Sequence, residues 1–131
     1  MNAFIVEAQN KPGELARIAG ILGDRGINIS TGAVLGLSSG GGFGFLTNDE
    51  MGAKSALDAA GIMCREVGVI PVNVADEPGS LAGLARRLGD AGVNIELVIP
   101  TGMSGGKMTL AVGVDNVEAA RAAVGEMVGA A

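Results

Sequence analysis

The first residues of the chain alternate between apolar and polar side chains. Apolar residues hold every second position from Phe4 to Ala8, which is the period of a half-buried strand. After a Pro-Gly pair, apolar residues recur at the spacing of one helix face, at Leu15, Ile18, Ala19 and Leu22. Gly26 comes just past this helix, where a left-handed residue commonly ends a helix. The pattern therefore predicts a strand, a turn and a helix.

The next forty residues extend this pattern to a complete small fold. The predicted elements are a strand over 27–37, a hairpin turn over 38–42, a strand over 43–47, a helix over 50–60 and a strand over 62–67. Asp49 is predicted to be the N-cap of the second helix. The order β-α-β-β-α-β is that of the ferredoxin-like plan, an α+β fold class with the helices on one face of an antiparallel sheet.

The second half of the chain repeats the first half at an offset of 66 residues. Residues 76–95 match residues 10–29 at eleven of twenty positions, which include both Pro-Gly pairs. The offset continues without a gap as far as Asp49 and Asp115, so Asp115 is predicted to cap a helix over 116–127. We expect two units, residues 1–67 and residues 68–131. A unit of this size is marginal alone, so the two should pack on each other or on a partner.

The second copy lacks room for a fourth strand, because only Val128-Gly129-Ala130-Ala131 follows its last helix. Its first strand, with Ile70, Val72 and Val74 on one face, also contains Pro71. Proline is confined to edge strands or bulges, and a missing fourth strand makes the first strand an edge. The two departures are consistent with each other.

The 66-residue offset also predicts the direction of two aromatic side chains. In the second copy, Met108, Leu110 and Val112 should face the helices. The matching positions in the first copy, which should face the same way, are Gly42, Gly44 and Leu46. Phe43 and Phe45 should then lie on the open face of the sheet. Such a patch marks an interface, which predicts a homodimer unless the other copy's sheet covers both rings.

Composition and charge exclude several functions. The formal net charge is −5, and no basic run is present for nucleic-acid binding. The chain has no histidine and one cysteine, Cys64, which excludes a tetrahedral Cys/His metal site and suggests an inert buried thiol. No apolar run is long enough to span a bilayer, and no signal peptide begins the chain. We therefore expect a soluble cytoplasmic protein with no cofactor and no enzymatic activity.

The candidate site is the Pro-Gly loop that begins the first helix of each copy. The first N–H groups of a helix are unpaired and its dipole is positive there, so the loop suits a carboxylate. Asn10 and Asp76 precede the loops and offer acceptors for an ammonium. Carboxylate and ammonium together indicate a free amino acid. The alternative is that each Pro-Gly pair only makes a tight turn, with Asn10 and Asp76 as helix caps.

The strand, Pro-Gly-x-Leu, helix and Gly-[Ile/Val]-Asn-Ile pattern, present twice, resembles a tandem ACT domain. The resemblance implies a regulatory module that binds an amino acid between neighbouring units. It places the ligand at Asn10, Lys11, Pro12, Gly13, Glu14 and Leu15 and at Asp76, Glu77, Pro78, Gly79, Ser80 and Leu81. Each loop is then expected to face the start of the second strand of a neighbouring unit, at Asn28 and Ile29 or at Asn94 and Ile95. The acidic pair 76–77 should weaken the second site for a zwitterionic or acidic amino acid. The alternative is a ligand-free subunit that acts through protein–protein contacts, with or without a regulated enzyme in trans.

Overall fold

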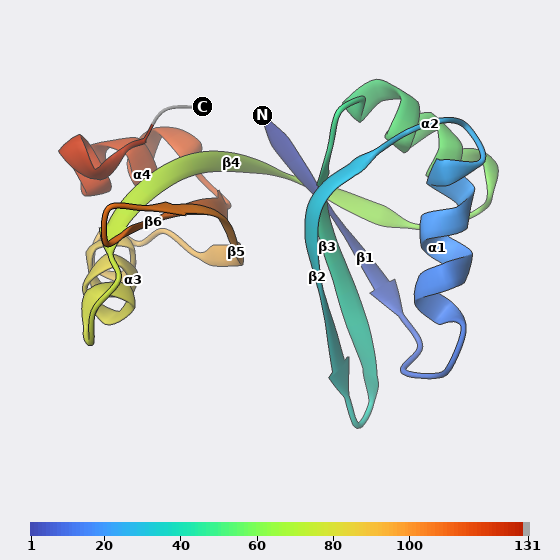
Figure 1. Cartoon of the computed structure of the whole chain (residues 1–131), viewed down its shortest axis with the longest axis horizontal. Helices are drawn as coiled ribbons and strands as arrows, with labels where there is room; N and C mark the ends of the chain where they lie inside the picture. The colour runs from blue at the N-terminus through green and yellow to red at the C-terminus, as the bar shows by residue number, and fades with distance from the viewer. Residues whose placement is uncertain (130–131) are drawn as a thin grey trace. The chain divides into compact units, whose positions relative to one another are not determined.

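The computed structural model describes residues 1–129, which divide into two compact units (Figure 1). The first unit is Asn2–Glu66, and the second unit comprises Val67 onward together with Met1. Among the described residues, no helix is long and apolar enough to cross a membrane. Both units have the predicted α+β plan.

The first unit has a four-stranded antiparallel arrangement with both helices on one face (Figure 1). Its elements are β1 (Asn2–Ala8), α1 (Glu14–Gly23), β2 (Ile29–Leu37), β3 (Gly40–Thr47), α2 (Glu50–Ala59) and the beginning of β4 (Cys64–Ala75). The strand order β2-β3-β1-β4 is that of the ferredoxin-like plan. The alternating face of β1 supplies Phe4 and Val6 to the core, where they meet Ile18 and Leu22 of α1.

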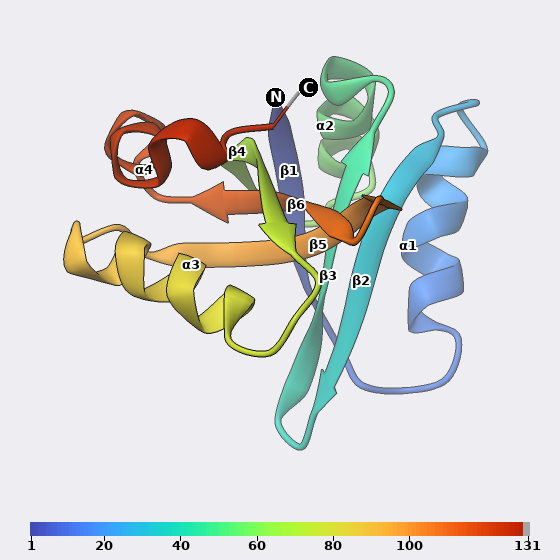
Figure 2. The ribbon, with the colours of Figure 1, turned by 60° about the vertical axis from the view of Figure 1, so that its left-hand side comes forward.

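The second unit repeats this plan with the remainder of β4 as its first strand. Its further elements are α3 (Ser80–Asp90), β5 (Ile95–Ser104), β6 (Lys107–Val114), α4 (Val117–Val124) and the 3-10 turn η1 (Gly125–Met127). The strand order is β4-β6-β5, and α3 and α4 lie side by side on one face (Figure 2). The core joins Ile70 and Val72 of β4 to Leu84 and Leu88 of α3.

One continuous strand, β4, replaces two strands that the sequence predicted as separate. Residues 62–67 and the strand carrying Ile70 belong to opposite copies of the repeat, but no turn interrupts the chain between them. Gly68 leaves room for Val117 at the start of α4, because a Cβ at Gly68 would lie against the Val117 side chain. The last strand of the first unit therefore runs directly into the first strand of the second.

A one-residue shift breaks the repeat offset within the second hairpin. Ile29 and Ile95 begin equivalent strands at an offset of 66, but the hairpin pair Leu37–Gly40 corresponds to the pair Ser104–Lys107 at an offset of 67. The extra residue is absorbed at the irregularity between Pro100 and Gly102 in β5. Such a bulge puts two residues opposite one on the partner strand. The prediction of a gapless repeat through Asp115 was wrong for this reason.

The shift also reverses the predicted direction of the two phenylalanines. Phe43 and Phe45 face the helices and are buried, and Phe45 stacks on Phe4 with ring centroids 5.5 Å apart. Moving the register by one residue turns every side chain of a strand to the other face. The prediction that both rings lie on the open face was wrong, and they form no surface patch.

The ends of β3 and α4 also differ from the predictions. Gly40, Gly41 and Gly42 belong to β3, and the hairpin turn is only Ser38-Ser39. Asp49 caps α2 as predicted by accepting from the Gly52 N–H. Asp115 does not cap α4: Asn116 accepts from the Ala119 N–H instead, and α4 begins at Val117.

The last described residues of the second unit pair with β4. Val128 bridges Val72 of β4, and the Gly129 N–H donates to the Pro71 carbonyl at 2.8 Å. Pro71 has no N–H to donate at this strand position, but its carbonyl accepts the hydrogen bond from Gly129. Ala130 and Ala131, which the sequence analysis judged too short for a strand with Val128 and Gly129, lie outside the described residues.

Candidate functional site

Each Pro-Gly loop ends at a glycine that begins a helix in the left-handed conformation. Gly13 has φ 87° before α1, and Gly79 has φ 88° before α3, with no side-chain cap on either helix. A positive φ favours glycine over any residue with a Cβ. The alternative that Asn10 and Asp76 cap these helices is therefore wrong, and both side chains are available for another role.

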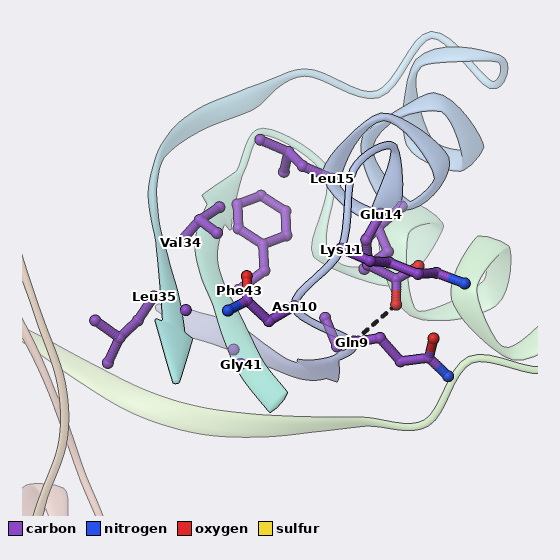
Figure 3. A pocket seen from close by; sticks show the side chains of 13 residues that line it. Gln9, Asn10, Lys11, Glu14, Leu15, Val34, Leu35, Gly41 and Phe43 are labelled. Atoms are coloured by element: carbon purple, nitrogen blue, oxygen red, sulfur yellow. Dashed lines mark hydrogen bonds between the residues drawn. The ribbon is translucent and has the colours of Figure 1, made fainter. Parts of the chain in front are cut away.

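A cavity of about 90 Å³ opens beside the first of these loops (Figure 3). We call it the loop pocket. It lies between the loop, the first turns of α1 and the paired ends of β2 and β3, and it is lined by Ala8, Gln9, Asn10, Lys11, Glu14, Leu15, Ile18, Val34, Leu35, Gly36, Gly41, Gly42 and Phe43. Asn10, Lys11, Glu14 and Leu15 of the predicted set line it, whereas Pro12 and Gly13 do not.

Asn10 is anchored at the mouth of the loop pocket by the end of β2. Its Nδ2 donates to the Leu37 carbonyl at 3.2 Å. Its amide lies against Gly36 so closely that a Cβ at Gly36 would come within 2.9 Å of Oδ1. Because the amide nitrogen donates to the strand, Oδ1 is the hydrogen-bond acceptor that remains on the Asn10 side chain.

Glu14 holds the loop onto the helix from inside the first turn of α1. Its buried carboxylate accepts the Gln9 N–H at 2.8 Å and the Arg17 Nε at 2.7 Å. The hydrogen bond from Arg17, followed by the one from Gln9, lowers the pKa of Glu14 below its usual value. Glu14 therefore stays ionised and gives the pocket wall a fixed negative charge.

Apolar side chains from three elements, α1, β2 and β3, face each other across the loop pocket. Figure 3 shows Leu15, Val34 and Phe43 converging on it, while Leu35 and the Lys11 ammonium point away. Leu15 and Val34 are about half exposed, with 46% and 55% of their surfaces accessible. These residues supply a contact surface for a small apolar side chain, and only Leu15 among them was predicted from the sequence.

Most of the lining residues that the sequence analysis missed come from the β2–β3 hairpin, and the others are Ala8, Gln9 and Ile18. Antiparallel pairing sets Ala8 opposite Gly41, and Gly41 opposite Gly36. This pairing brings residues about thirty positions further along the chain beside the Pro-Gly loop. Two glycines of β3, Gly41 and Gly42, are among the lining residues, and a Cβ at Gly41 would lie against the Leu35 backbone carbonyl. The Gly-rich run was visible in the sequence, but its position beside the loop required the register.

The second unit has a pocket of about 440 Å³ at the equivalent place. It is lined by Val74, Ala75, Asp76, Glu77, Ser80, Leu81, Val98, Pro100, Met108 and Leu110. Asp76, Glu77, Ser80 and Leu81 of the predicted set line it, whereas Pro78 and Gly79 do not. Ser80 stands where Glu14 stands in the first unit, and Met108 and Leu110 correspond to Gly41 and Phe43. The two units therefore have a pocket at the same place in the fold, but different side chains line it.

The structure does not bring Asn28 and Ile29 to the loop pocket of their own unit. Ile29 pairs with Thr47, at the opposite end of the hairpin from Gly36 and Gly41. Asn28 instead donates its N–H to Asn48 Oδ1. Asn94 likewise donates its N–H to Asp115 Oδ1, and Ile95 pairs with Val114. In both units these residues hold the strand to the start of the second helix.

The described residues offer little catalytic chemistry. Burial raises the pKa of the Cys64 thiol, which disfavours the reactive thiolate. Among residues 1–129, no group of three or more Asp, Glu or Cys side chains is placed to hold a metal ion. Both pockets instead combine a few polar groups with apolar walls, as small-molecule binding sites do.

Comparison with known proteins identifies the family of the first unit. Residues 3–60 match the family model of the ACT domain, which confirms the resemblance. No curated protein matches the chain in sequence.

Solved structures resemble the chain over almost its whole length. A protein from Bacteroides thetaiotaomicron has a TM-score of 0.73 and 20% identity, over 95% of this chain and 86% of that chain. The regulatory subunit of aspartate kinase from Thermus flavus has a TM-score of 0.66 and 22% identity, over 96% and 92%. The ligand-free regulatory subunit of aspartate kinase from Thermus thermophilus has a TM-score of 0.63 and 20% identity, over 96% of this chain and 91% of that chain. At these identities the likeness shows the fold.

Proposed function

Residues 3–60 are an ACT domain, and from this premise we propose that the protein is a regulator that binds a free amino acid in the loop pocket. One observation carries the proposal. Pockets open at the same place in both units, beside a left-handed glycine that begins a helix, although their lining residues differ. A tight turn alone does not require a pocket. Retention of the hollow with different linings favours a ligand-binding role.

The groups around the loop pocket suit the two ends of an amino acid. Asn10 Oδ1 and the ionised Glu14 are acceptors for an ammonium. The first N–H groups of α1 have no acceptor one turn earlier within the helix, and they favour a carboxylate. Val34 and Phe43 give the side chain an apolar wall. The small cavity favours an amino acid with a short side chain.

The regulatory part of the proposal draws on proteins with this fold. The Thermus flavus protein is the regulatory subunit of aspartate kinase, so the fold serves regulation elsewhere. We infer that this chain likewise acts on a partner, whose activity changes when the amino acid binds. Such control needs a difference in ligand affinity between two states of the complex.

We propose that a second copy of the chain completes the site. β2 is the edge strand of the first unit, and Val34, Leu35 and Leu37 on it are each more than half exposed. Unpaired edges and apolar patches invite association. A neighbouring copy is also the way for Asn28 and Ile29 to reach a loop pocket, since their own unit keeps them at the far end of the hairpin.

The two sites are proposed to differ in affinity. Asp76 and Glu77 line the second pocket, where Asn10 and Lys11 line the first. Two unit charges about 4 Å apart interact by about 1 kcal/mol in water, so a second carboxylate near the ligand carboxylate is unfavourable. Calorimetric titration should show a large loss of tight binding for Asn10→Ala and a smaller change for Asp76→Ala. Equal losses would contradict the assignment.

The alternative function is a ligand-free subunit that acts through protein contacts. The exposed apolar residues of β2 favour it as much as they favour a dimer. Under this alternative, no amino acid stabilises the fold, and a partner protein covers β2.

Thermal unfolding with each of the twenty amino acids tests the proposal. Circular dichroism is the suitable signal because the chain has no Trp or Tyr. A ligand at about 100 times its Kd stabilises the native state by about 2.7 kcal/mol. We expect one or a few small amino acids to raise the Tm of the wild type and to raise that of Asn10→Ala much less. No shift with any amino acid would favour the ligand-free alternative.

A further inference from the structure

A second cavity of about 490 Å³ lies in the first unit, apart from the loop pocket. We call it the edge cavity. Its lining residues come from β1, α1, the segment that joins α2 to β4 and the first residues of β4, and they are Ile5, Glu7, Arg17, Ala60, Gly61, Ile62, Met63, Cys64 and Arg65. None of these residues lines the loop pocket. The two cavities therefore present separate surfaces to solutes.

The lining of the edge cavity combines two guanidinium groups, those of Arg17 and Arg65, and the Glu7 carboxylate with apolar side chains. Ile5, Ile62 and Met63 supply the apolar part, and Met63 is 89% exposed in the described unit. A methionine side chain adapts to irregular ligand shapes and is often used at binding surfaces. An exposed methionine beside a partly apolar hollow is a surface that a ligand with an apolar body would cover.

Arg17 is held in place from behind. Its Nε donates to Glu14 Oε1 at 2.7 Å, and Glu14 is itself fixed by the Gln9 N–H. Within the part of the chain that the structure describes, the two Nη atoms of Arg17 make no hydrogen bond. A guanidinium can bind a carboxylate through two parallel N–H donors. Arg17 thus presents an oriented pair of donors at the cavity.

We propose that the edge cavity is a second ligand site, which binds a small monocarboxylate with an apolar chain. Arg17 binds the carboxylate, and Ile5, Ile62 and Met63 contact the chain. Arg17 and Arg65 together with Glu7 give the lining a formal charge of +1, which matches a ligand with one carboxylate better than a ligand with two. The site therefore discriminates against dicarboxylates. This proposal is independent of amino-acid binding in the loop pocket.

The Glu14–Arg17 pair gives the two sites a physical link. Glu14 lines the loop pocket, and Arg17 lines the edge cavity. A carboxylate bound to the two Nη atoms does not displace the hydrogen bond from Arg17 Nε to Glu14. It therefore restrains the Arg17 side chain without breaking the Glu14–Arg17 pair. We expect occupation of the edge cavity to leave Glu14 ionised and in place, and the two ligands to bind together rather than to compete.

Methyl NMR of the full chain with hexanoate as probe tests the edge cavity. We expect saturable shifts at the Ile5, Ile62 and Met63 methyls, with Leu15 and Val34 unchanged. Adipate, which adds a second carboxylate, and hexylamine, which lacks the carboxylate, should bind at least tenfold more weakly. Shifts confined to Leu15 and Val34, no saturable shift at all, or equal affinity for adipate would each overturn the proposal.

Two variants test the role of Arg17 with hexanoate. Arg17→Gln should weaken binding at least tenfold, while Arg25→Gln, which removes the same charge from an exposed position outside the cavity, should bind as the wild type does. Glu14→Gln keeps the Arg17 charge but removes its partner, and it should weaken binding less than Arg17→Gln does. Unchanged affinity in Arg17→Gln, or equal losses in Arg17→Gln and Arg25→Gln, would overturn the assignment. Because Arg17 is exposed, circular dichroism should show a folded variant.

Discussion

At the scale of single residues, the loop pocket depends on an absent side chain. Gly36 lines the pocket, and its lack of a side chain leaves the space that the Asn10 amide occupies. A Cβ 2.9 Å from Asn10 Oδ1 is closer than van der Waals contact allows, so a residue larger than glycine must displace the amide. Gly36 is thus a positioning residue for the acceptor that we assign to the ammonium.

We expect Gly36→Ala to weaken amino-acid binding in the loop pocket about tenfold, which corresponds to about 1.4 kcal/mol. The displaced amide loses its bond to Leu37, while the fold persists because Asn10 is exposed and can move. Calorimetric titration with an amino acid that stabilises the wild type measures the change. Gly102→Ala is the matched control, because a Cβ at Gly102 on β5 meets nothing within 4 Å. A similar loss in both variants would contradict the positioning role.

Glu14 should make the stability of the protein depend on pH. Its pKa is lowered in the folded state, chiefly by Arg17. A lowered pKa contributes stability above the unfolded-state value of about 4.3. That contribution is lost as the pH falls through the folded-state pKa.

Urea unfolding at about pH 6 and about pH 3, on either side of the ordinary glutamate pKa, measures this contribution. We expect wild type to be more stable than Glu14→Gln at the higher pH, with the difference shrinking at the lower pH. Arg17→Gln should show the same reduced pH dependence. A difference that stays constant between the two pH values would show that Glu14 acts without its charge.

At the scale of elements, the β2–β3 hairpin presents one buried face and one exposed face. Phe45 is fully buried against Phe4, whereas Leu35 on the partner strand is 63% exposed. The two residues therefore differ in what they contribute, although both are large and apolar. Phe45 belongs to the core of the first unit, and Leu35 belongs to its surface.

We expect Phe45→Ala to lower the free energy of unfolding by about 3–5 kcal/mol, the usual cost of removing a buried aromatic ring. Leu35→Ala on the same hairpin should change it by no more than about 0.5 kcal/mol, as for other surface substitutions. Chemical denaturation followed by circular dichroism at low protein concentration gives both values. Similar losses in the two variants would place Leu35 in a buried contact instead.

At the scale of the whole molecule, the question is what covers β2. Each unit is small and marginal alone, and the first unit exposes Val34, Leu35 and Leu37 along its edge strand. Because Phe45 is a core residue, a charge at that position would unfold the unit rather than report on association. Leu35 is the appropriate position for testing the homodimer.

We expect sedimentation to show a dimer at micromolar concentration for the wild type and a monomer for Leu35→Glu. The glutamate places a charge on the proposed contact, while Leu35 is exposed within its own unit, so the fold should persist. Met51→Glu is the control, because Met51 on α2 is 87% exposed and outside the edge strand. A monomeric wild type would refute the dimer, and a dimer that survives Leu35→Glu would move the contact elsewhere.

The sequence by itself determined the repeat, the element order and the left-handed glycine, Gly26, that follows the first helix. These features depend on local preferences: apolar spacing selects strand or helix, and a positive φ selects glycine. The helix faces through Ile18 and Leu22, and through Leu84 and Leu88, followed from spacing alone. The Asn10–Leu15 segment was likewise identified as a candidate site before its surroundings were known.

Only the tertiary structure decided which residues meet across the sheet. The direction of Phe43 and Phe45 is set by the pairing of β3 with β1 and β2. The repeat predicted this direction wrongly because the second copy has one extra residue near Pro100, and a shift of one residue reverses the face of a strand. The position of Gly36 under Asn10 depends on antiparallel pairing between segments far apart in the chain. Such contacts are set by register and long-range packing, and no local pattern in the sequence encodes them.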